Sequence, residues 1–521
     1  MILVNCARKG RPEGGPKDEN APIFVTADPP YETTHFSKDE IKIYFDEYII
    51  LKDIRKKLIV SPPMKNPPII TPQGIPSKYI TINILDTLLE NTTYIFNFGS
   101  AVQDNNEGNK IENFKYVFST GSYIDSLIIK GSVKDAFLKK TEKNINVLLY
   151  RIDSSFTDSI VFKKKPNYVA STLDSTAYNF TNVKAGKYFL VALKEEISDY
   201  LFHPKSEKIG FLTKPIVLPK DSIIATPLVL FEEQLPYKFK RAKEITKGKL
   251  QFSFLGVRKD ITIKVLSKVP ESYKSIYHLD KEKDTIYYWF TPLEIDSLNF
   301  VVSNKNEIDT VTVKFKKKKI DSLIFSPSTK GALHFKDTFF IETNNPILQI
   351  DITKIQLIDK DTLKVPFHTL LSEKENKINF LFDKEEDEKY VLTILPNSLT
   401  DIFFQQNDTL KYQFRTKKKE EYGTLLLNVK NPKSHHLIIE LLSERGKVVR
   451  KKYLSISKII KFDLLLPKKY IVRATIDSNY NRKWDTGNFL KQQQPETIIY
   501  YPDELEIRAN WHVNQTLVIE Q

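Results

Sequence analysis

Cysteine is almost absent from this chain, since Cys6 is the only one among 521 residues. No intramolecular disulfide can therefore form, and each domain must be held together by packing alone. The sequence also lacks an uninterrupted apolar run of about 18 residues, so it offers no candidate for a helix that spans a bilayer. HExxH, G-x-S-x-G, Walker-type and Gly-rich dinucleotide motifs are missing as well, which removes the usual support for those enzyme classes.

Acidic residues are outnumbered, because 65 Asp and Glu stand against 79 Lys and Arg and give a formal net charge of +14. The basic residues are spread along the chain, and the local runs at residues 163–165, 316–319 and 417–419 are short. None of these runs is accompanied by zinc-finger spacing, a recognition helix or an aromatic RNA-binding signature. We therefore expect solvated strand ends here and no nucleic-acid partner.

What the chain does contain is sequence that favours β-structure. Hydrophobic residues make up 41%, and 33 Phe and 25 Tyr supply the large flat side chains that are common in sheets. Short apolar or alternating runs such as IKIYFDEYIIL, GKYFLVAL and DTVTVKF are separated by Asn, Asp, Pro and Gly turns. Because the chain exceeds what one hydrophobic core supports, we expect an all-β fold of tandem β-sandwiches, arranged like beads on a string.

Two pairs of related segments divide the chain further. SAVQDNNEGNKIENFKYVFSTG, from Ser100, corresponds to SLTDIFFQQNDTLKYQFRTK, from Ser398, since in each a turn with Asp and Asn leads to a strand ending in Phe-x-Thr. Their upstream halves also correspond, namely IKIYFDEYIILKDIRKKLIVSPP from Ile41 and NPILQIDITKIQLIDKDTLKVPF from Asn345. This pair predicts two copies of one sandwich.

The second pair consists of VKAGKYFLVAL, from Val183, and LLPKKYIVRAT, from Leu465. In both, a turn precedes a tyrosine and a strand whose alternate residues are apolar, as expected for a strand packed on one face. The order of the two pairs, with an unpaired region between them, predicts a tether followed by five sandwiches. Their predicted bounds are 1–20 for the tether, then 21–122, 123–218, 219–328, 329–419 and 420–521, with the type of 219–328 unassigned.

These residues also carry a resemblance to a known family. CARKGRPEGGPKDENAP, FDEYIILKD, SPP and DNNEGN-x₄-F-x-YVFSTG resemble Bacteroidota lipoproteins that begin with a bacterial Ig-like domain just after the lipidated cysteine. KGSVKDA with AGKYFLVAL, and the ending DSNYNRKWDTGNFLKQQQPE, resemble the transthyretin-like, carboxypeptidase-regulatory-type sandwich. The resemblance implies Ig-like domains at 21–122 and 329–419 and transthyretin-like sandwiches at 123–218 and 420–521.

The resemblance further implies what the protein does and where. It implies a lipoprotein anchored in the outer membrane, at the cell surface, whose partners are outer-membrane proteins. Such a protein acts as a scaffold or interaction subunit, for example as an accessory component of an outer-membrane protein assembly machine. Sandwiches of these types carry no active site of their own, so a non-enzymatic role is expected.

Leu3-Val4-Asn5-Cys6 is similar to a bacterial lipobox, although Asn5 departs from the small residue expected there. If the start codon is misassigned or the chain is trimmed, Cys6 becomes the first mature residue and carries a covalent lipid that anchors the protein. The Gly/Pro/Lys stretch behind it would then be a flexible tether. The alternative is a cytoplasmic chain with an incidental thiol.

One loop has the spacing of a cation site. Asp477, Asn479, Asn481 and Asp485 place oxygen-bearing side chains at positions 1, 3, 5 and 9, which suits a hard cation such as Ca²⁺. Arginine and asparagine stand where an EF-hand loop has glycine and a bidentate glutamate, so the loop carries less charge than a tight site requires. The alternative is an Asx-rich turn whose side chains cap their own backbone.

The aromatic run at residues 287–290, Tyr-Tyr-Trp-Phe, could line a sugar platform or a protein interface. Alternation along a strand places its first and third residues on one face and the second and fourth on the other, so at most half of the run can meet a partner. A surface carbohydrate-binding or adhesive protein is therefore the alternative function. An enzyme with its site in the unassigned region 219–328 is a third hypothesis, which an apolar pocket with convergent titratable groups would support.

Overall fold

The computed structural model describes residues 18–258, 260–280, 285–305, 307–316, 318–372 and 375–520. This part of the chain contains forty β-strands, one α-helix, α1 (Ile54–Lys57), and the short 3₁₀ helices η1 (Ile160–Phe162), η2 (Ile352–Lys354) and η3 (Lys419–Glu421). The predicted all-β fold of tandem sandwiches is therefore confirmed. Cys6, the predicted lipidation site, lies outside the described residues. Within them, no helix combines the length and the apolar character that crossing a membrane requires.

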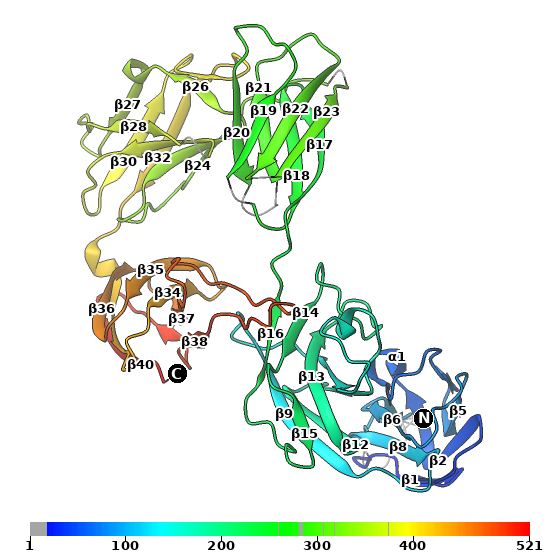
Figure 1. Cartoon of the computed structure of the whole chain (residues 1–521). Coiled ribbons are helices and arrows are strands. Elements are labelled where there is room, and N and C mark those ends of the chain that lie inside the picture. The colour runs from blue at the N-terminus through cyan, green and yellow to red at the C-terminus, as the bar shows by residue number, and fades with distance from the viewer. Residues whose placement is uncertain are drawn as a thin grey trace, which may run out of the picture. The chain divides into compact units, whose positions relative to one another are not determined.

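The chain divides into two compact units. Figure 1 labels the strands that form their sandwiches. Unit 1 takes its residues from two stretches, the chain up to Glu233 and the short segment Asp485–Glu496. Unit 2 consists of Gln234–Trp484 and the residues from Thr497 onward. A segment that was expected in the last sandwich is thus part of the N-terminal unit.

The first sandwich belongs to unit 1. Its strands are β1 (Phe24–Asp28), β2 (Glu40–Leu51), β3 (Ile59–Ser61), β4 (Ile69–Thr71), β5 (Ser77–Asn83), β6 (Thr93–Gly99), β7 (Val102–Asp104) and β8 (Phe114–Ser119). One sheet has the order β1-β2-β5-β4, with β7 added to β2, and the other has the order β3-β6-β8. Side chains alternate along β2, so Ile41, Ile43 and Phe45 are buried in the core while Tyr44 and Tyr48 are exposed.

The third sandwich, in unit 2, has the same order of pairing. Its strands are β17 (Lys238–Thr246), β18 (Lys249–Leu255), β19 (Ile261–Val265), β20 (Ser275–Asp280), β21 (Thr285–Phe290), β22 (Ser297–Asn304) and β23 (Glu307–Lys314). The sheets β17-β18-β21-β20 and β19-β22-β23 repeat the A-B-E-D and C-F-G arrangement of immunoglobulin sandwiches. The region whose type the sequence left unassigned is therefore a sandwich with immunoglobulin strand order.

The fourth sandwich repeats the pairing order of the first. It comprises β24 (Phe325–Pro327), β25 (Phe339–Thr343), β26 (Ile347–Ile350), β27 (Ile355–Ile358), β28 (His368–Leu371), β29 (Lys377–Leu381), β30 (Lys389–Ile394), β31 (Leu399–Asp401) and β32 (Leu410–Arg415). Its sheets have the orders β24-β25-β29-β28 and β27-β30-β32, and β26 pairs with β31 as β2 pairs with β7. The two copies also share a hydrogen-bonded corner, because the Tyr94 hydroxyl accepts from the Leu89 N–H and the Tyr390 hydroxyl accepts from the Glu385 N–H, each at 2.8 Å.

The second and fifth sandwiches form another matching pair. The second, in unit 1, has β9 (Leu127–Asp135), β10 (Asn146–Arg151), β11 (Tyr168–Ser171), β12 (Ala177–Val183), β13 (Gly186–Lys194), β14 (Lys208–Phe211), β15 (Ile216–Leu218) and β16 (Leu228–Glu232). The fifth, in unit 2, has β33 (Gly423–Lys430), β34 (Leu437–Ser443), β35 (Val448–Leu454), β36 (Lys458–Leu465), β37 (Lys469–Ile476), β38 (Ile498–Tyr500), β39 (Leu505–Glu506) and β40 (His512–Val518).

Pairing in these two sandwiches agrees around the first strand of each. β9 lies between antiparallel β12 and parallel β16, and β33 lies between antiparallel β36 and parallel β40. The tyrosines of the second sequence repeat are equivalent too, since the Tyr188 hydroxyl donates to the Lys184 carbonyl at 2.8 Å and the Tyr470 hydroxyl to the Leu466 carbonyl at 2.9 Å. The aligned segments therefore occupy the same place in both folds.

The second sandwich extends past residue 218, where the sequence pattern ended it. β16 lies beyond that boundary and pairs with both β9 and β14. Leu228 and Leu230 on this strand are buried in the core of the second sandwich, which is why the strand belongs there.

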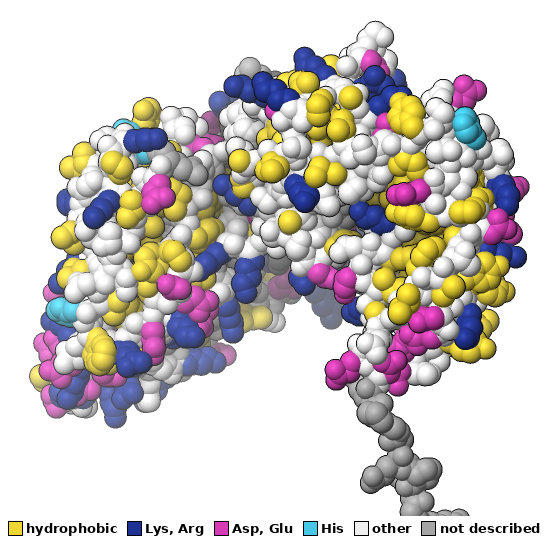
Figure 2. Space-filling view, turned by 90° about the horizontal axis from the view of Figure 1, so that it is seen from below, with side chains coloured by type: hydrophobic (Ala, Val, Ile, Leu, Met, Phe, Trp, Pro, Cys, Tyr) yellow, Lys and Arg dark blue, Asp and Glu magenta, His cyan; other side chains and the backbone are white. Residues whose placement is uncertain are grey.

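On the face shown in Figure 2, Lys and Arg side chains are interspersed with Asp and Glu, as expected for dispersed charge.

Candidate functional site

The predicted calcium loop follows β37, and its side-chain oxygens accept hydrogen bonds from the loop's own backbone. The buried Asp477 carboxylate accepts hydrogen bonds from the N–H groups of Asn481 and Arg482, at 3.1 and 2.9 Å. The Asn479 side-chain oxygen accepts from the Asn481 N–H at 3.1 Å, and the Asn481 side-chain oxygen accepts from the Lys483 N–H at 3.0 Å. These contacts are the Asx-turn pattern that stood as the alternative to a cation site.

Asp485, the fourth predicted ligand, begins the segment that belongs to unit 1, whereas the other three lie in unit 2. Its N–H donates to the Glu496 carboxylate at 3.1 Å. Among the residues that the structure describes, no group of three or more His, Cys, Asp or Glu side chains is placed to hold a metal ion. Calcium binding by this loop stays a prediction.

The aromatic run at residues 287–290 forms part of β21 and alternates as predicted. Tyr288 and Phe290 lie in the core of the third sandwich. Trp289 is on the opposite face, where only 3% of it is exposed, and packs against Ile402 and Phe403 of the fourth sandwich. The outward tryptophan is therefore covered by the chain itself, and we call this contact the tryptophan junction.

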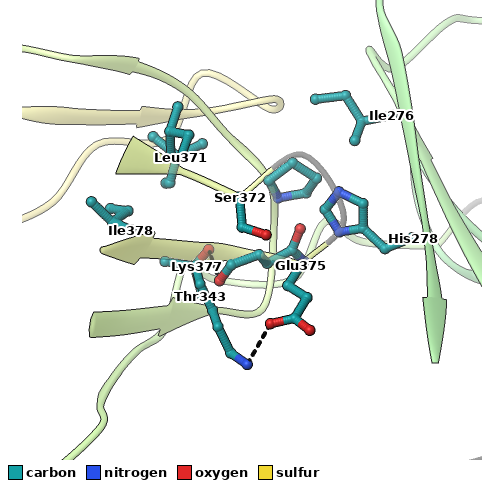
Figure 3. A pocket seen from close by; sticks show the side chains of 11 residues that line it. Ile276, His278, Thr343, Leu371, Ser372, Glu375, Lys377 and Ile378 are labelled. Atoms are coloured by element: carbon teal, nitrogen blue, oxygen red, sulfur yellow. Dashed lines mark hydrogen bonds and ion pairs between the residues drawn. The ribbon is translucent and has the colours of Figure 1, made fainter. Parts of the chain in front are cut away.

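A pocket of about 240 Å³ lies between the third and fourth sandwiches (Figure 3). Ile276 and His278 reach it from β20, and the other lining residues come from the fourth sandwich. Figure 3 shows His278 facing Ser372 and Glu375, while the Glu375 carboxylate pairs with the Lys377 ammonium at 2.7 Å. The pocket thus brings together titratable groups from two predicted domains, which sequence reasoning could not foresee.

The chemistry of this pocket is limited by His278. Burial lowers the pKa of its imidazole below the ordinary value, and the nearby Asn376 amide and Glu375 carboxylate oppose that shift only in part. The ring is therefore neutral at pH 7. The Nδ1 atom of His278 has no hydrogen-bond partner within the described residues.

A larger cavity of about 510 Å³ lies in unit 1, between the first and second sandwiches. Nine of its fourteen lining residues are aliphatic, methionine or proline, and all nine come from the first sandwich. Its only charged lining residues are Arg55 and Lys165, and both are cationic. The Lys165 ammonium donates to the Met64 carbonyl at 2.7 Å, and burial raises the pKa of Tyr200, which also lines the cavity, to about 12. We call this feature the proline cavity.

The proline cavity had a signal in the sequence, the stretch SPPMKNPPII at residues 61–70. Its SPP portion ends a segment of the first sequence repeat and also carries part of the family resemblance. The other lining residues of the cavity lie about a hundred positions or more further along the chain, namely Lys165, Ser198 and Tyr200. Such a site cannot be read from local spacing.

Exposed tyrosines lie on the outer face of the first sandwich. Tyr44 on β2 and Tyr79 on β5 are register partners, with ring centroids 6.0 Å apart. Tyr48 is 57% exposed, and the Lys78 ammonium is 5.5 Å from the centroid of its ring. These residues form what we call the tyrosine face.

Comparison with known proteins identifies the first sandwich. Residues 18–120 match a family model described as a bacterial Ig-like domain, which confirms the prediction of such a domain at this end of the chain. No curated protein matches the chain.

Several solved structures share a distant likeness. Surface layer protein SbsC, domains 1–6, is 12% identical over 94% of this chain and 68% of its own, with a TM-score of 0.16. BcpA, the major pilin subunit of Bacillus cereus, is 9% identical over 76% and 99%, with a TM-score of 0.14. Bacteroides ovatus SGBP-B in complex with a mixed-linkage heptasaccharide is 10% identical over 70% and 88%, with a TM-score of 0.18. At these values the likenesses carry no argument about function.

Proposed function

We propose that this chain is a non-enzymatic cell-envelope scaffold whose tandem sandwiches hold partner proteins at an outer membrane. The observation that carries the proposal is the packing of neighbouring sandwiches against each other within a unit. In unit 2, Trp289 packs on Ile402 and Phe403 of the next sandwich. In unit 1, the Val169 N–H donates to the Ser61 hydroxyl of the preceding sandwich at 3.1 Å. Contacts of this kind hold partner-binding surfaces at a set spacing, which freely jointed domains do not.

The anchor in this proposal is a lipid on Cys6, and the cell surface is the proposed location. Mass spectrometry of the native N-terminal peptide should find Cys6 acylated, and a Cys6→Ser variant should leave the membrane fraction. Several acyl chains are needed for durable attachment, since one chain binds a membrane only marginally. An unmodified Cys6 in a membrane-bound protein would refute this anchor.

The partner is the part of the proposal that most needs an experiment. Chemical cross-linking in intact cells, followed by purification of the full chain in mild detergent, should recover a defined set of outer-membrane proteins. The finer proposal is that this set includes subunits of a machine that assembles outer-membrane proteins, as the family resemblance implies. Recovery of the chain alone, at a cross-linker dose that captures other complexes, would contradict the scaffold role.

The second candidate is a carbohydrate-binding or adhesive surface protein, and the tyrosine face favours it. Aromatic rings that stay exposed on a sheet are suited to stacking against a ligand. If this function holds, a glycan array should give hits that Tyr44→Ala and Tyr79→Ala remove. Tyr123→Ala is the matched control, because Tyr123 is 55% exposed and lies outside the tyrosine face.

A further inference from the structure

The proline cavity has the size of a small-ligand site. Its volume of about 510 Å³ falls in the range of roughly 300–1,000 Å³ that ligand pockets in proteins occupy. Met64 and Ile70 are almost fully buried, whereas Ile69 is 49% exposed. Apolar side chains therefore extend from the cavity wall to its rim, where a ligand can cover them.

The charged groups at the cavity all have one sign. Arg55, on α1, and Lys165, from the second sandwich, line it, and none of its described lining residues is Asp or Glu. Arg55 makes no ion pair within the part of the chain that the structure describes. The Lys165 ammonium is held at the cavity by its hydrogen bond to the Met64 carbonyl. An apolar wall with two cations and no carboxylate is complementary to an apolar ligand with an anionic head.

β-Strand addition is a poorer fit for this place, although β4 is an edge strand of its sheet. Pro67 and Pro68 precede β4 and Pro72 follows it. Prolines at an edge remove the N–H donors that an added strand needs. The occupant is therefore better sought among ligands that fill the cavity than among peptides that extend the sheet.

We infer that the proline cavity binds a free single-chain anionic amphiphile, a fatty-acid-like carboxylate whose alkyl chain lies on the apolar wall and whose head pairs with Arg55 and Lys165. This site is independent of the scaffold function, because it requires only unit 1. The two sandwiches supply different parts of it, the first the apolar wall and Arg55, the second Lys165 and Tyr200.

The test is isothermal titration of the full chain with decanoate, octanoate and decyltrimethylammonium. Decanoate should bind about fifteenfold more tightly than octanoate, since each buried methylene contributes about fourfold. Decyltrimethylammonium should bind at least tenfold more weakly than decanoate, because its head is repelled. Equal affinity for the two head groups, or no binding of decanoate, would overturn the inference.

Variants locate the site. Arg55→Glu should weaken decanoate binding about five- to tenfold, and Ile69→Glu should abolish it. Lys56→Glu and Ile75→Glu are the matched controls, because these residues are exposed, lie near the first pair in the chain and do not line the cavity. Decanoate binding that all four variants leave unchanged would place the ligand elsewhere and refute the assignment.

A final arm separates the free carboxylate from a membrane lipid. Phosphatidylglycerol vesicles should fail to displace decanoate, since the cavity holds one chain and the vesicle presents only head groups. Displacement by vesicles at equal anion concentration would mean that Arg55 and Lys165 bind the head groups of a membrane surface, which contradicts the proposal. The proposal would also be contradicted if an acidic peptide displaced decanoate as effectively as octanoate displaces it.

Discussion

At the scale of single residues, tyrosine hydroxyls mark the two sequence repeats. Tyr94 and Tyr390 close one kind of corner, and Tyr188 and Tyr470 close another. Burial raises the pKa of Tyr390 above its ordinary value, so the hydroxyl keeps its proton. The equivalence of Tyr188 and Tyr470 could be predicted because each follows a conspicuous local pattern, a turn that leads into an apolar strand. The expected packing on one face is wrong for β13, since its residues from Tyr188 to Leu193 are all buried.

Replacing Tyr390 with phenylalanine removes the acceptor for the Glu385 N–H. We expect a loss of about 1 kcal/mol in the unfolding free energy of the fourth sandwich, the usual contribution of one hydrogen bond. Hydrogen exchange at β30, the strand that carries Tyr390, measures the change in this sandwich alone. Tyr412→Phe is the control, because this substitution removes no hydrogen bond within the described residues. It should change the unfolding free energy of the fourth sandwich by less than about 0.5 kcal/mol. Equal losses in the two variants would contradict a role for the corner.

Glu195 makes unit 1 sensitive to pH. Burial raises the pKa of its carboxyl from 4.5 to about 7, although the carboxylate accepts hydrogen bonds from the Asn146 amide and the Tyr200 N–H. Protonation therefore favours the folded state, so the stabilising contribution of this group is present below pH about 4.5 and is lost as the pH rises through about 7.

In Glu195→Gln that contribution no longer depends on pH. Between about pH 5 and pH 8 the free energy that opens β13, the strand before Glu195, should fall more in the wild type than in the variant, as hydrogen exchange at both pH values will measure. Glu196→Gln, at the neighbouring position, should behave like the wild type. A variant whose pH profile coincides with that of the wild type would show that Glu195 titrates normally.

The calcium loop gives a residue-scale prediction about a ligand. If the loop binds Ca²⁺, about 1 mM calcium should raise the melting temperature, chelation should reverse the rise, and Asp477→Asn should abolish it. Asp503→Asn, at an exposed position of the fifth sandwich, should leave the rise unchanged. Equal melting temperatures in calcium and in chelator would contradict calcium binding, and the role of Asp477 would then be to accept the hydrogen bonds of its turn.

At the scale of elements, the segment Asp485–Glu496 shows how a stretch far along the chain completes unit 1. Phe489 is fully buried there, and its ring centroid lies 5.2 Å from that of Phe211 and 5.9 Å from that of Phe162. A Cβ on Gly487 would lie 2.6 Å from the Phe231 ring, so the close approach requires glycine. The Gln494 side-chain amide donates to the Phe211 carbonyl at 2.9 Å.

Phe489→Ala should destabilise unit 1 by about 3–5 kcal/mol, because it leaves a cavity among aromatic side chains. Hydrogen exchange at β13 and β14 is the measurement, since a multidomain chain has no single unfolding free energy. Leu490→Ala is the matched control, as Leu490 is 59% exposed, and exchange should be unchanged. Unchanged protection in Phe489→Ala would mean that the segment does not stabilise these strands.

At the scale of the whole molecule, the tryptophan junction joins two sandwiches of unit 2. The Lys249 ammonium lies 5.2 Å from the ring centroid of Trp289, and burial lowers the pKa of this lysine. The indole N–H of Trp289 has no hydrogen-bond partner within the described residues, so the junction depends on packing. Immunoglobulin strand order alone does not provide such a contact.

A double-mutant cycle tests this junction. Trp289→Ala and Phe403→Ala should each destabilise unit 2, and their combined effect should differ from the sum by about 0.5–3 kcal/mol. Hydrogen exchange at β21 in the full chain measures the opening free energy of the two single variants and the double variant. Trp511→Ala, which removes a tryptophan that is 57% exposed, should be additive with Phe403→Ala. Additivity of Trp289→Ala with Phe403→Ala would contradict energetic coupling across the junction.

Much of the fold could be predicted because the pattern of apolar and polar residues along a strand shows which of its faces is buried. Alternation along β2 and β21 assigns each side chain to a face, and the two sequence repeats predict which strands are equivalent. The unassigned region resisted prediction because its strand order is fixed by pairing and has no counterpart repeat in the sequence. The boundary at residue 218 missed β16 for a similar reason, since its partner β9 lies about a hundred residues earlier.

The sequence by itself determined that this chain is all-β, that it is built of tandem sandwiches and that two pairs of sandwiches correspond, because these properties follow from periodicity along single strands and from the similarity of short segments. Only the tertiary structure decided that Trp289 is covered, that Phe489 packs in a unit formed mostly by residues far earlier in the chain, and that Arg55 and Lys165 share a cavity. Each of these depends on surfaces that meet only after separate sandwiches have folded, and local periodicity carries no record of which faces will meet.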